Sequence, residues 1–184
     1  MPIVIGVIVV ILVAIIGYFI GTYNVLVQLR NRVRDQWSQI DIQLKRRFDL
    51  VPNLVETVKG YVKHEKDTLE GVVKARNAYQ TAATPEEQMK ADSELNKTLT
   101  KLFALAEAYP DLKANENFME LQTELSNIEE KISSARQFYS DTVLNYNNKI
   151  QMFPSNIVAS IFGFKEEKFF EAQTEERENV KVQF

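Results

Sequence analysis

Apolar residues form two patterns in this chain, a continuous run at the start and long stripes with helical spacing after it. Residues 3–21 contain only Ile, Val, Leu, Ala, Gly, Phe and one Tyr, and the first charged side chain is that of Arg30. At about 1.5 Å per helical residue, this run matches the ~30 Å hydrocarbon layer of a bilayer. It predicts a transmembrane anchor over residues 1–23.

A cleaved signal peptide is the alternative interpretation of the same run. Such a peptide has a basic start, an apolar stretch of about 7–15 residues and a small-residue cleavage site. Here residues 1–2 carry no basic side chain, the apolar run is longer, and no A-x-A-like site follows it. The pattern therefore favours a retained anchor.

After the anchor, apolar side chains recur in alternating steps of three and four, which is one face of a helix. No glycine or proline interrupts residues 22–51, so the anchor is expected to continue directly into the first helix of the following domain. The first stripe comprises Leu26, Leu29, Val33, Trp37, Ile40 and Leu44.

Prolines and capping residues predict where this helix ends and where the next two begin. Asp49 and Pro52 predict a break, followed by a second helix to about residue 81. Thr84, followed by proline and with Glu87 three positions on, has the pattern of a capping box at the start of a third helix. Pro110 is expected to end that helix.

A fourth and longest helix is predicted to begin at a capping Asn115 and to stop at Phe153-Pro154. A short apolar helix over residues 157–162 follows, closed by Gly163. The inward stripes of the second to fourth helices comprise Leu54, Val55, Val58, Val62, Leu69, Val72, Val73, Tyr79, Leu95, Leu99, Leu102, Ala106, Tyr109, Phe118, Leu121, Leu125, Ile128, Ile132, Ala135, Tyr139, Val143, Tyr146 and Ile150.

These elements predict an all-α protein, an N-terminal transmembrane helix followed by an elongated antiparallel four-helix bundle over residues 24–163. The rival is an extended helical rod that pairs only on oligomerising. A charged C-terminal tail, residues 164–184, contains the paired Phe169-Phe170 and is expected to be frayed or loosely docked. The scarcity of glycine (6) and proline (5) fits long helices.

Candidate catalytic and metal-binding residues are few. There is no cysteine, and His64 is the one histidine. His64 begins an H-E-x-x-H pattern that fails at Thr68, and a di-iron bundle would need two Glu-x-x-His pairs. The adjacent pairs Glu86-Glu87 and Glu129-Glu130 point about 100° apart on a helix and are expected on solvated faces or at a helix start. We expect no enzyme, metal or cofactor. The net charge of −3 argues against a nucleic-acid partner.

Gly17 and Gly21 form a G-x-x-x-G spacing, which lets two membrane helices approach closely and predicts a homo-oligomer. Arg30, Arg32 and Arg34 follow the span and are candidates for lipid-headgroup contact. Their position also predicts, by the positive-inside tendency, a bundle on the cytoplasmic side of the membrane.

Lys45, Arg46 and Arg47 form a second basic cluster. If the first helix stands upright, Arg46 lies about 40 Å beyond the membrane exit. That distance exceeds a Debye length of about 8 Å several-fold. A structural ion pair or a protein-partner surface is therefore the preferred role. Further on, Asn145, Asn147 and Asn148 interrupt an apolar stripe and predict buried hydrogen bonds, with residues 23–24 or 39–41 as candidate partners.

Long motifs in this chain resemble the LemA family. They are YNVLV at 23–27, WSQID at 37–41, QLKRRFDLVPNLVETVKGY at 43–61, ALAEAYPDLKAN at 104–115 and FPSN at 153–156. The resemblance covers essentially the whole chain. It implies a bacterial membrane protein with one N-terminal span, an elongated four-helix bundle and no agreed activity. Relatives are linked with envelope-associated proteins and proteases, and one branch with building magnetosome membranes.

Together these features predict a non-enzymatic, membrane-anchored scaffold that acts by docking and multimerisation on an unidentified envelope protein. The alternative is a membrane-shaping protein, in which the short helix at 157–162 and Phe169-Phe170 insert into the interface.

Overall fold

The computed structural model describes residues 1–62 and 65–169, and every regular element among them is a helix. The helices are α1 (Pro2–Lys59), α2 (Lys66–Thr81), α3 (Pro85–Ala106), α4 (Pro110–Lys113), α5 (Glu116–Gln151) and α6 (Ser155–Ile161). Their residues fall into two compact units, unit 1 with Met1–Gln39 and Ser134–Phe184, and unit 2 with Ile40–Ser133. Helices α1 and α5 contribute to both. The division into anchor, bundle and tail at 1–23, 24–163 and 164–184 stays a prediction.

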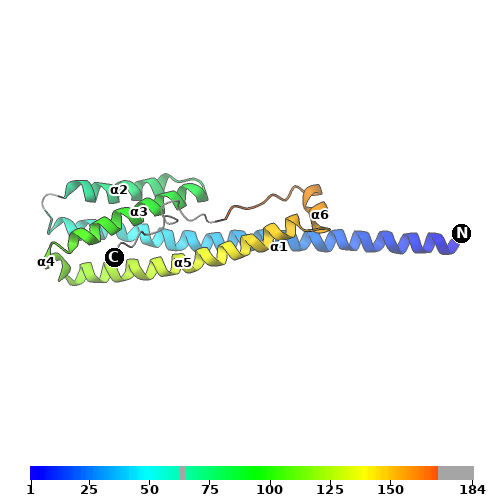
Figure 1. Ribbon diagram of the computed structural model, residues 1–184, viewed down its shortest axis with the longest axis horizontal. Helices are drawn as coiled ribbons and strands as arrows, with labels where there is room; N and C mark the ends of the chain where they lie inside the picture. The colour runs from blue at the N-terminus through cyan, green and yellow to red at the C-terminus, as the bar shows by residue number, and fades with distance from the viewer. Residues whose placement is uncertain (63–64, 170–184) are drawn as a thin grey trace, which may run out of the picture. The chain divides into compact units, whose positions relative to one another are not determined.

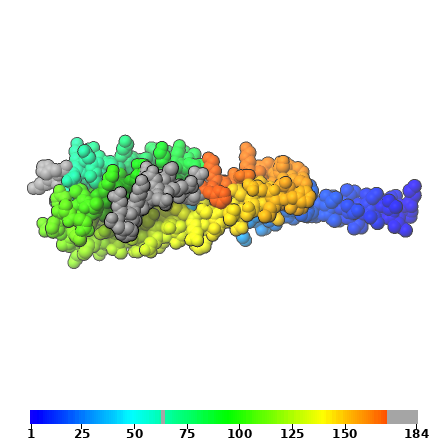
Figure 2. All heavy atoms as spheres, viewed as in Figure 1, coloured from blue at the N-terminus to red at the C-terminus, as the bar shows by residue number. Residues whose placement is uncertain are grey.

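Helix α1 confirms that the apolar run continues without interruption into the stripe that follows it. Of the described helices, it is the one long and apolar enough to cross a membrane, and its most apolar stretch is not covered by the rest of the protein. Figure 2 shows this bare N-terminal part in dark blue. Leu26, Val33, Ile40 and Leu44 are buried, as the stripe predicted.

The predicted break at Asp49 and Pro52 is wrong, because α1 continues through Pro52 to Lys59. Proline has no N–H, so the carbonyl of Phe48 loses its helical donor at this point. Val51, Leu54 and Phe48 around it are buried, and this apolar burial offsets the lost bond. The chain turns instead after Gly60, so α2 begins at Lys66, later than expected.

Unit 2 is built from residues 40–59 of α1, the helices α2, α3 and α4, and residues 116–133 of α5. The chain reverses direction between successive long helices, and α2 lies beside α3 (Figure 1). Each of the four long segments contributes to one apolar core, with fully buried Leu44, Leu54, Val72, Leu95, Leu102 and Ile132. This is the up-and-down order expected of a bundle.

The helix starts of unit 2 follow the predicted capping chemistry. Thr84 accepts from the backbone N–H of Glu87, and the Glu87 carboxylate accepts from the N–H of Thr84, which completes the capping box. Asn115 Oδ1 accepts from the N–H of Phe118 at 2.9 Å and caps α5. Helix α3 ends at Ala106, and Pro110 starts the one-turn α4 rather than ending α3.

The buried stripes largely match those expected from spacing. Val73 is the exception, because α2 buries Leu69, Val72 and Ala75, and Val73 points away from that line and is exposed.

Unit 1 contains residues 1–39 of α1, the second half of α5 and α6. Helix α5 ends at Gln151, just before Phe153-Pro154, as predicted, and Gly163 follows α6 with a φ of 69°. Tyr139, Val143 and Tyr146 from α5 are buried, and Trp37 packs edge-on against Tyr139 with ring centroids 5.8 Å apart.

Replacing Pro52 with Ala is expected to stabilise the protein. Pro52 is exposed, so no packing is lost, and the N–H of the new alanine can donate to the carbonyl of Phe48. Proline in a helix interior is less favourable than Ala by about 3 kcal/mol, and Pro52→Ala should recover a part of this. Thermal melts followed by circular dichroism in detergent should show a raised Tm. Pro85→Ala, at the first turn of α3 where no donor is missing, is the matched control. A lowered Tm for Pro52→Ala would contradict this account.

Candidate functional site

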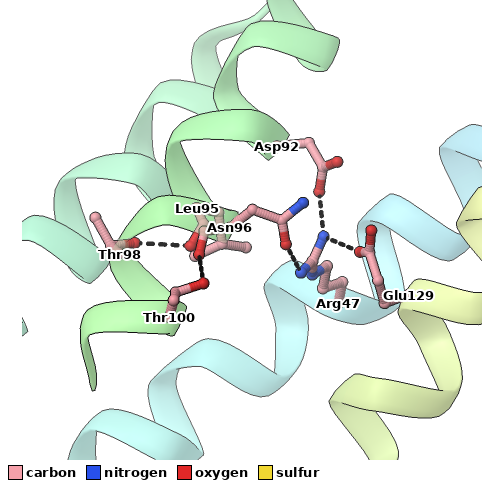
Figure 3. Close-up of polar contacts among 7 residues, drawn as sticks. All are labelled: Arg47, Asp92, Leu95, Asn96, Thr98, Thr100 and Glu129. Carbon is pink, nitrogen blue, oxygen red and sulfur yellow. Dashed lines mark hydrogen bonds and ion pairs between the residues drawn. The ribbon is translucent and has the colours of Figure 1, made fainter. Parts of the chain in front are cut away.

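The most concentrated polar chemistry in unit 2 surrounds the buried side chain of Arg47, which projects from α1 (Figure 3). Its Nη1 lies 2.8 Å from Asp92 Oδ1 on α3 and 2.6 Å from Glu129 Oε2 on α5. Its Nη2 donates to Asn96 Oδ1 on α3. One guanidinium thus joins three helices, and its planar fork suits such a multiple contact.

Burial makes this cluster strongly dependent on its partners. The side chain of Arg47 is 4% exposed and that of Asp92 is 0% exposed, whereas Glu129 is 37% exposed. A buried charge is tolerated when it is paired and hydrogen-bonded, and is costly when a partner is removed. The cluster therefore fixes which side chains of α1, α3 and α5 face one another.

These contacts correct two predictions. Arg47 is buried and is not part of an exposed partner surface. It forms the structural ion pair that the sequence analysis gave as the other possible role of this basic cluster. Glu129 is not a freely solvated charge, since it pairs with Arg47. Lys45 and Arg46 are exposed, and their role as a partner surface stays a prediction.

A second polar contact in unit 2 joins α1 to α2. The Tyr79 hydroxyl donates to Asp41 Oδ1 at 3.0 Å, and the Tyr79 ring stacks on Phe48 with centroids 4.0 Å apart. Burial, helped by this hydrogen bond and by the charge of Asp41, raises the pKa of Tyr79 well above its ordinary value. In this contact Tyr79 acts as a hydrogen-bond donor that ties α2 to α1.

In unit 1 an aromatic cluster holds the end of α6 against α1. The Tyr23 ring lies 4.8 Å from that of Phe162 and 5.7 Å from that of Phe164. The Arg30 guanidinium carbon lies 5.0 Å from the centroid of Phe164, a cation–π contact. Tyr23 therefore marks the level along α1 at which the chain leaves α6.

Beyond Phe164 the chain runs along α5 and is tied to it by Asn147. The buried amide of Asn147 donates to the carbonyl of Glu167 at 2.8 Å and accepts from its N–H at 3.0 Å. Tyr139 donates to the carbonyl of Lys168 at 3.1 Å. The expectation of buried asparagine bonds holds for Asn147, but the partner is the start of the tail. Burial raises the pKa of the neighbouring Tyr146.

The start of the tail, residues 164–168, is thus docked against α5. The prediction of a frayed or loosely docked tail also concerns residues 170–184, which lie outside the described residues. His64 also lies outside them. Among the residues that the structure describes, no group of three or more His, Cys, Asp or Glu side chains could hold a metal ion.

The remaining candidate residues lie along α1. Gly17 and Gly21 face open space, with no atom near the position of an added Cβ. Arg32 and Arg34 are exposed, whereas Arg30 is half-buried through its contact with Phe164. Contact with lipid headgroups and helix pairing both stay predictions.

Removing the Arg47 charge should destabilise unit 2 strongly. Arg47→Met leaves Asp92 buried without this cation, a change that typically costs about 3–5 kcal/mol. The exposed neighbour Arg46→Met should change the unfolding free energy by no more than about 0.5 kcal/mol. Denaturant unfolding measures both. If the ion pair is the cause, adding Asp92→Leu to Arg47→Met should restore much of the lost stability. Equal stability of Arg47→Met and Arg46→Met would refute this account.

Comparisons with known proteins identify related sequences. The LemA family profile matches residues 36–184. Protein LemA of Metamycoplasma hominis is 26% identical over 163 residues, which cover 88% of this chain and 74% of the relative. Magnetosome protein MamQ 2 of Paramagnetospirillum magneticum and Magnetosome protein MamQ of Magnetospirillum gryphiswaldense are each 24% identical over 185 residues, covering 86% of this chain and 68% of the relative. The chain belongs to the LemA family.

Proposed function

We propose that this protein is a non-enzymatic scaffold of the bacterial cell envelope, anchored in the inner membrane by α1. It acts by docking an envelope protein and by associating with further copies of itself. Membrane association is supported by the long apolar stretch of α1 and by the relatives named as magnetosome proteins. The docking partner is a protein of the same membrane, and exposed Lys45 and Arg46 are the candidate contacts.

The observation that carries this proposal is the continuity of α1. One helix, Pro2–Lys59, contains the apolar stretch and also supplies core residues such as Leu44 and Leu54. This continuity with the folded core supports a retained anchor. The anchor is therefore treated as a working part of the domain, and its removal is expected to abolish function rather than relocate it.

Self-association is assigned to the side of α1 that carries Gly17 and Gly21, here called the glycine face. Gly17 and Gly21 lie one turn apart, and neither is covered by another part of the described chain. In lipid, where apolar burial gives no net drive, close backbone approach at small residues favours helix pairing. Two copies would meet along this face.

Gly17→Leu combined with Gly21→Leu is expected to weaken this pairing several-fold, because the leucines hold the two backbones apart. Energy transfer between labelled copies in vesicles measures it. Ile8→Phe combined with Leu12→Phe is the control, since it adds bulk at the same spacing on the opposite side of a 3.6-residue helix. Undiminished energy transfer in the glycine variant would exclude this face as the interface.

The orientation proposed for the anchor places the folded domain in the cytoplasm. Arg30, Arg32 and Arg34 follow the span closely, and no basic side chain precedes it. Green fluorescent protein fused after Phe184 is expected to fluoresce, and alkaline phosphatase fused there to stay inactive. Arg32→Gln with Arg34→Gln should make the orientation less uniform. Active phosphatase on the unaltered chain would reverse the topology.

Membrane shaping is the second candidate function, and the exposed apolar side chains around α6 favour it. In this mechanism assembled copies insert these side chains and bend the bilayer. Vesicles containing the full chain would then become tubules or small spheres in electron micrographs, whereas a scaffold leaves them unchanged.

A further inference from the structure

The turn between α5 and α6 carries an unusual concentration of exposed apolar surface. Within residues 152–162, here called the α5–α6 tip, five large apolar side chains are between 45% and 81% exposed. They are Met152, Phe153, Ile157, Ile161 and Phe162. Soluble surfaces seldom gather such residues in one patch, and a patch of this kind marks a contact with protein or membrane.

The position of the tip along α1 identifies which contact this is. Pro154 and Ile157 line one apolar hollow of about 390 Å³ together with side chains of α1 from Ile11 to Phe19. At about 1.5 Å per residue, these α1 positions lie roughly 3–15 Å inside the end of the apolar run at Gly21. If residues 3–21 cross the bilayer, the tip is at the depth of the lipid. A soluble partner cannot reach it there.

The charge pattern of the tip fits the same environment. No Asp, Glu, Lys or Arg occurs from residue 150 to residue 164, and Lys149 and Lys165 flank this stretch. Lysine side chains at such boundaries extend their ammonium groups toward headgroups while their aliphatic parts stay in apolar surroundings.

Backbone groups at the tip are largely satisfied within the protein, as lipid requires. The Asn156 N–H donates to the Met152 carbonyl at 2.9 Å, and the Phe164 N–H donates to that of Ala159 at 2.9 Å. The Ser155 hydroxyl also donates to the Met152 carbonyl, at 2.9 Å. The turn can therefore enter an apolar phase without leaving these donors unpaired.

Helix α6 has three distinct sides. Val158 and Ala159 are buried against the protein, Ile157 and Ile161 are exposed one turn apart, and Asn156 and Ser160 are exposed on a separate line. An amphipathic helix with this division lies in the plane of the interface, its apolar side about 5–10 Å below the headgroups.

From this geometry we infer that the α5–α6 tip is a second membrane contact, embedded in the leaflet on the side of the folded domain. Its ligand is the acyl-chain region of the bilayer, which fills the hollow between Ile157 and α1. This inference rests on the proposal that α1 spans the membrane, and it does not depend on self-association. It gives each copy two attachments to the membrane, the spanning helix α1 and the shallow α5–α6 tip.

Spin labelling tests this on the full chain, because the sequence has no native cysteine. Phe153→Cys and Ile161→Cys place labels at exposed positions of the tip. Val10→Cys in the span and Ser126→Cys on the exposed side of α5 are the matched lipid and water controls. Each protein is reconstituted in vesicles of phosphatidylethanolamine and phosphatidylglycerol. Collision of the label with oxygen, which concentrates in lipid, is compared with collision with a water-soluble nickel chelate.

The labels at positions 153 and 161 are expected to favour oxygen several-fold over the chelate, as the label at Val10 does. Labels that instead resemble the one at Ser126 would overturn the inference while leaving the span intact. Labels shielded from both reagents would overturn it in favour of a protein contact. A Val10 label that reports water would refute the span itself and the tip contact with it. Unchanged circular dichroism shows that each variant is folded.

Discussion

The rest of this structure depends on α1 being one continuous helix from Pro2 to Lys59. A chain in hydrocarbon must satisfy its own amides, and a helix does so within one segment. Because α1 does not end after its apolar stretch or at Pro52, the same helix carries the chain from that stretch into core residues such as Leu44 and Leu54. The features of unit 1 therefore follow one another along the axis of this helix, first Gly17 and Gly21, then Tyr23 of the aromatic cluster, then the arginines from Arg30 onward.

The buried cation of Arg47 imposes a constraint of a different kind. Apolar stripes fill a core but discriminate poorly between neighbouring registers, since one leucine resembles another. A guanidinium that must meet Asp92, Asn96 and Glu129 together rejects arrangements in which any of the three is displaced. We interpret the cluster as a device for specificity as much as for stability, because a buried ion pair is often no more stabilising than apolar packing.

The sequence predicted the helices, the capping residues Thr84 and Asn115 and most of the core, because spacing and capping are local signals. It failed at Pro52, where tertiary burial of Val51 and Leu54 outweighs a local helix breaker. For Arg47 it left a structural ion pair and a partner surface both open, because a basic run looks the same whether solvated or paired. The partners of Arg47 lie 45 and 82 positions away, and no local pattern connects them.

The helical rise and rotation of α1 also limit how this chain can change its length. Each residue inserted between Gly21 and Leu26 would lift the following segment by about 1.5 Å and turn it by about 100°. A single insertion would therefore change, by about 100°, the angle about the helix axis between the uncovered glycines Gly17 and Gly21 and the buried side chain of Leu26. Insertions or deletions of seven or eleven residues nearly restore the angle. Length variation in this helix should thus occur in such steps, and single-residue changes should be excluded.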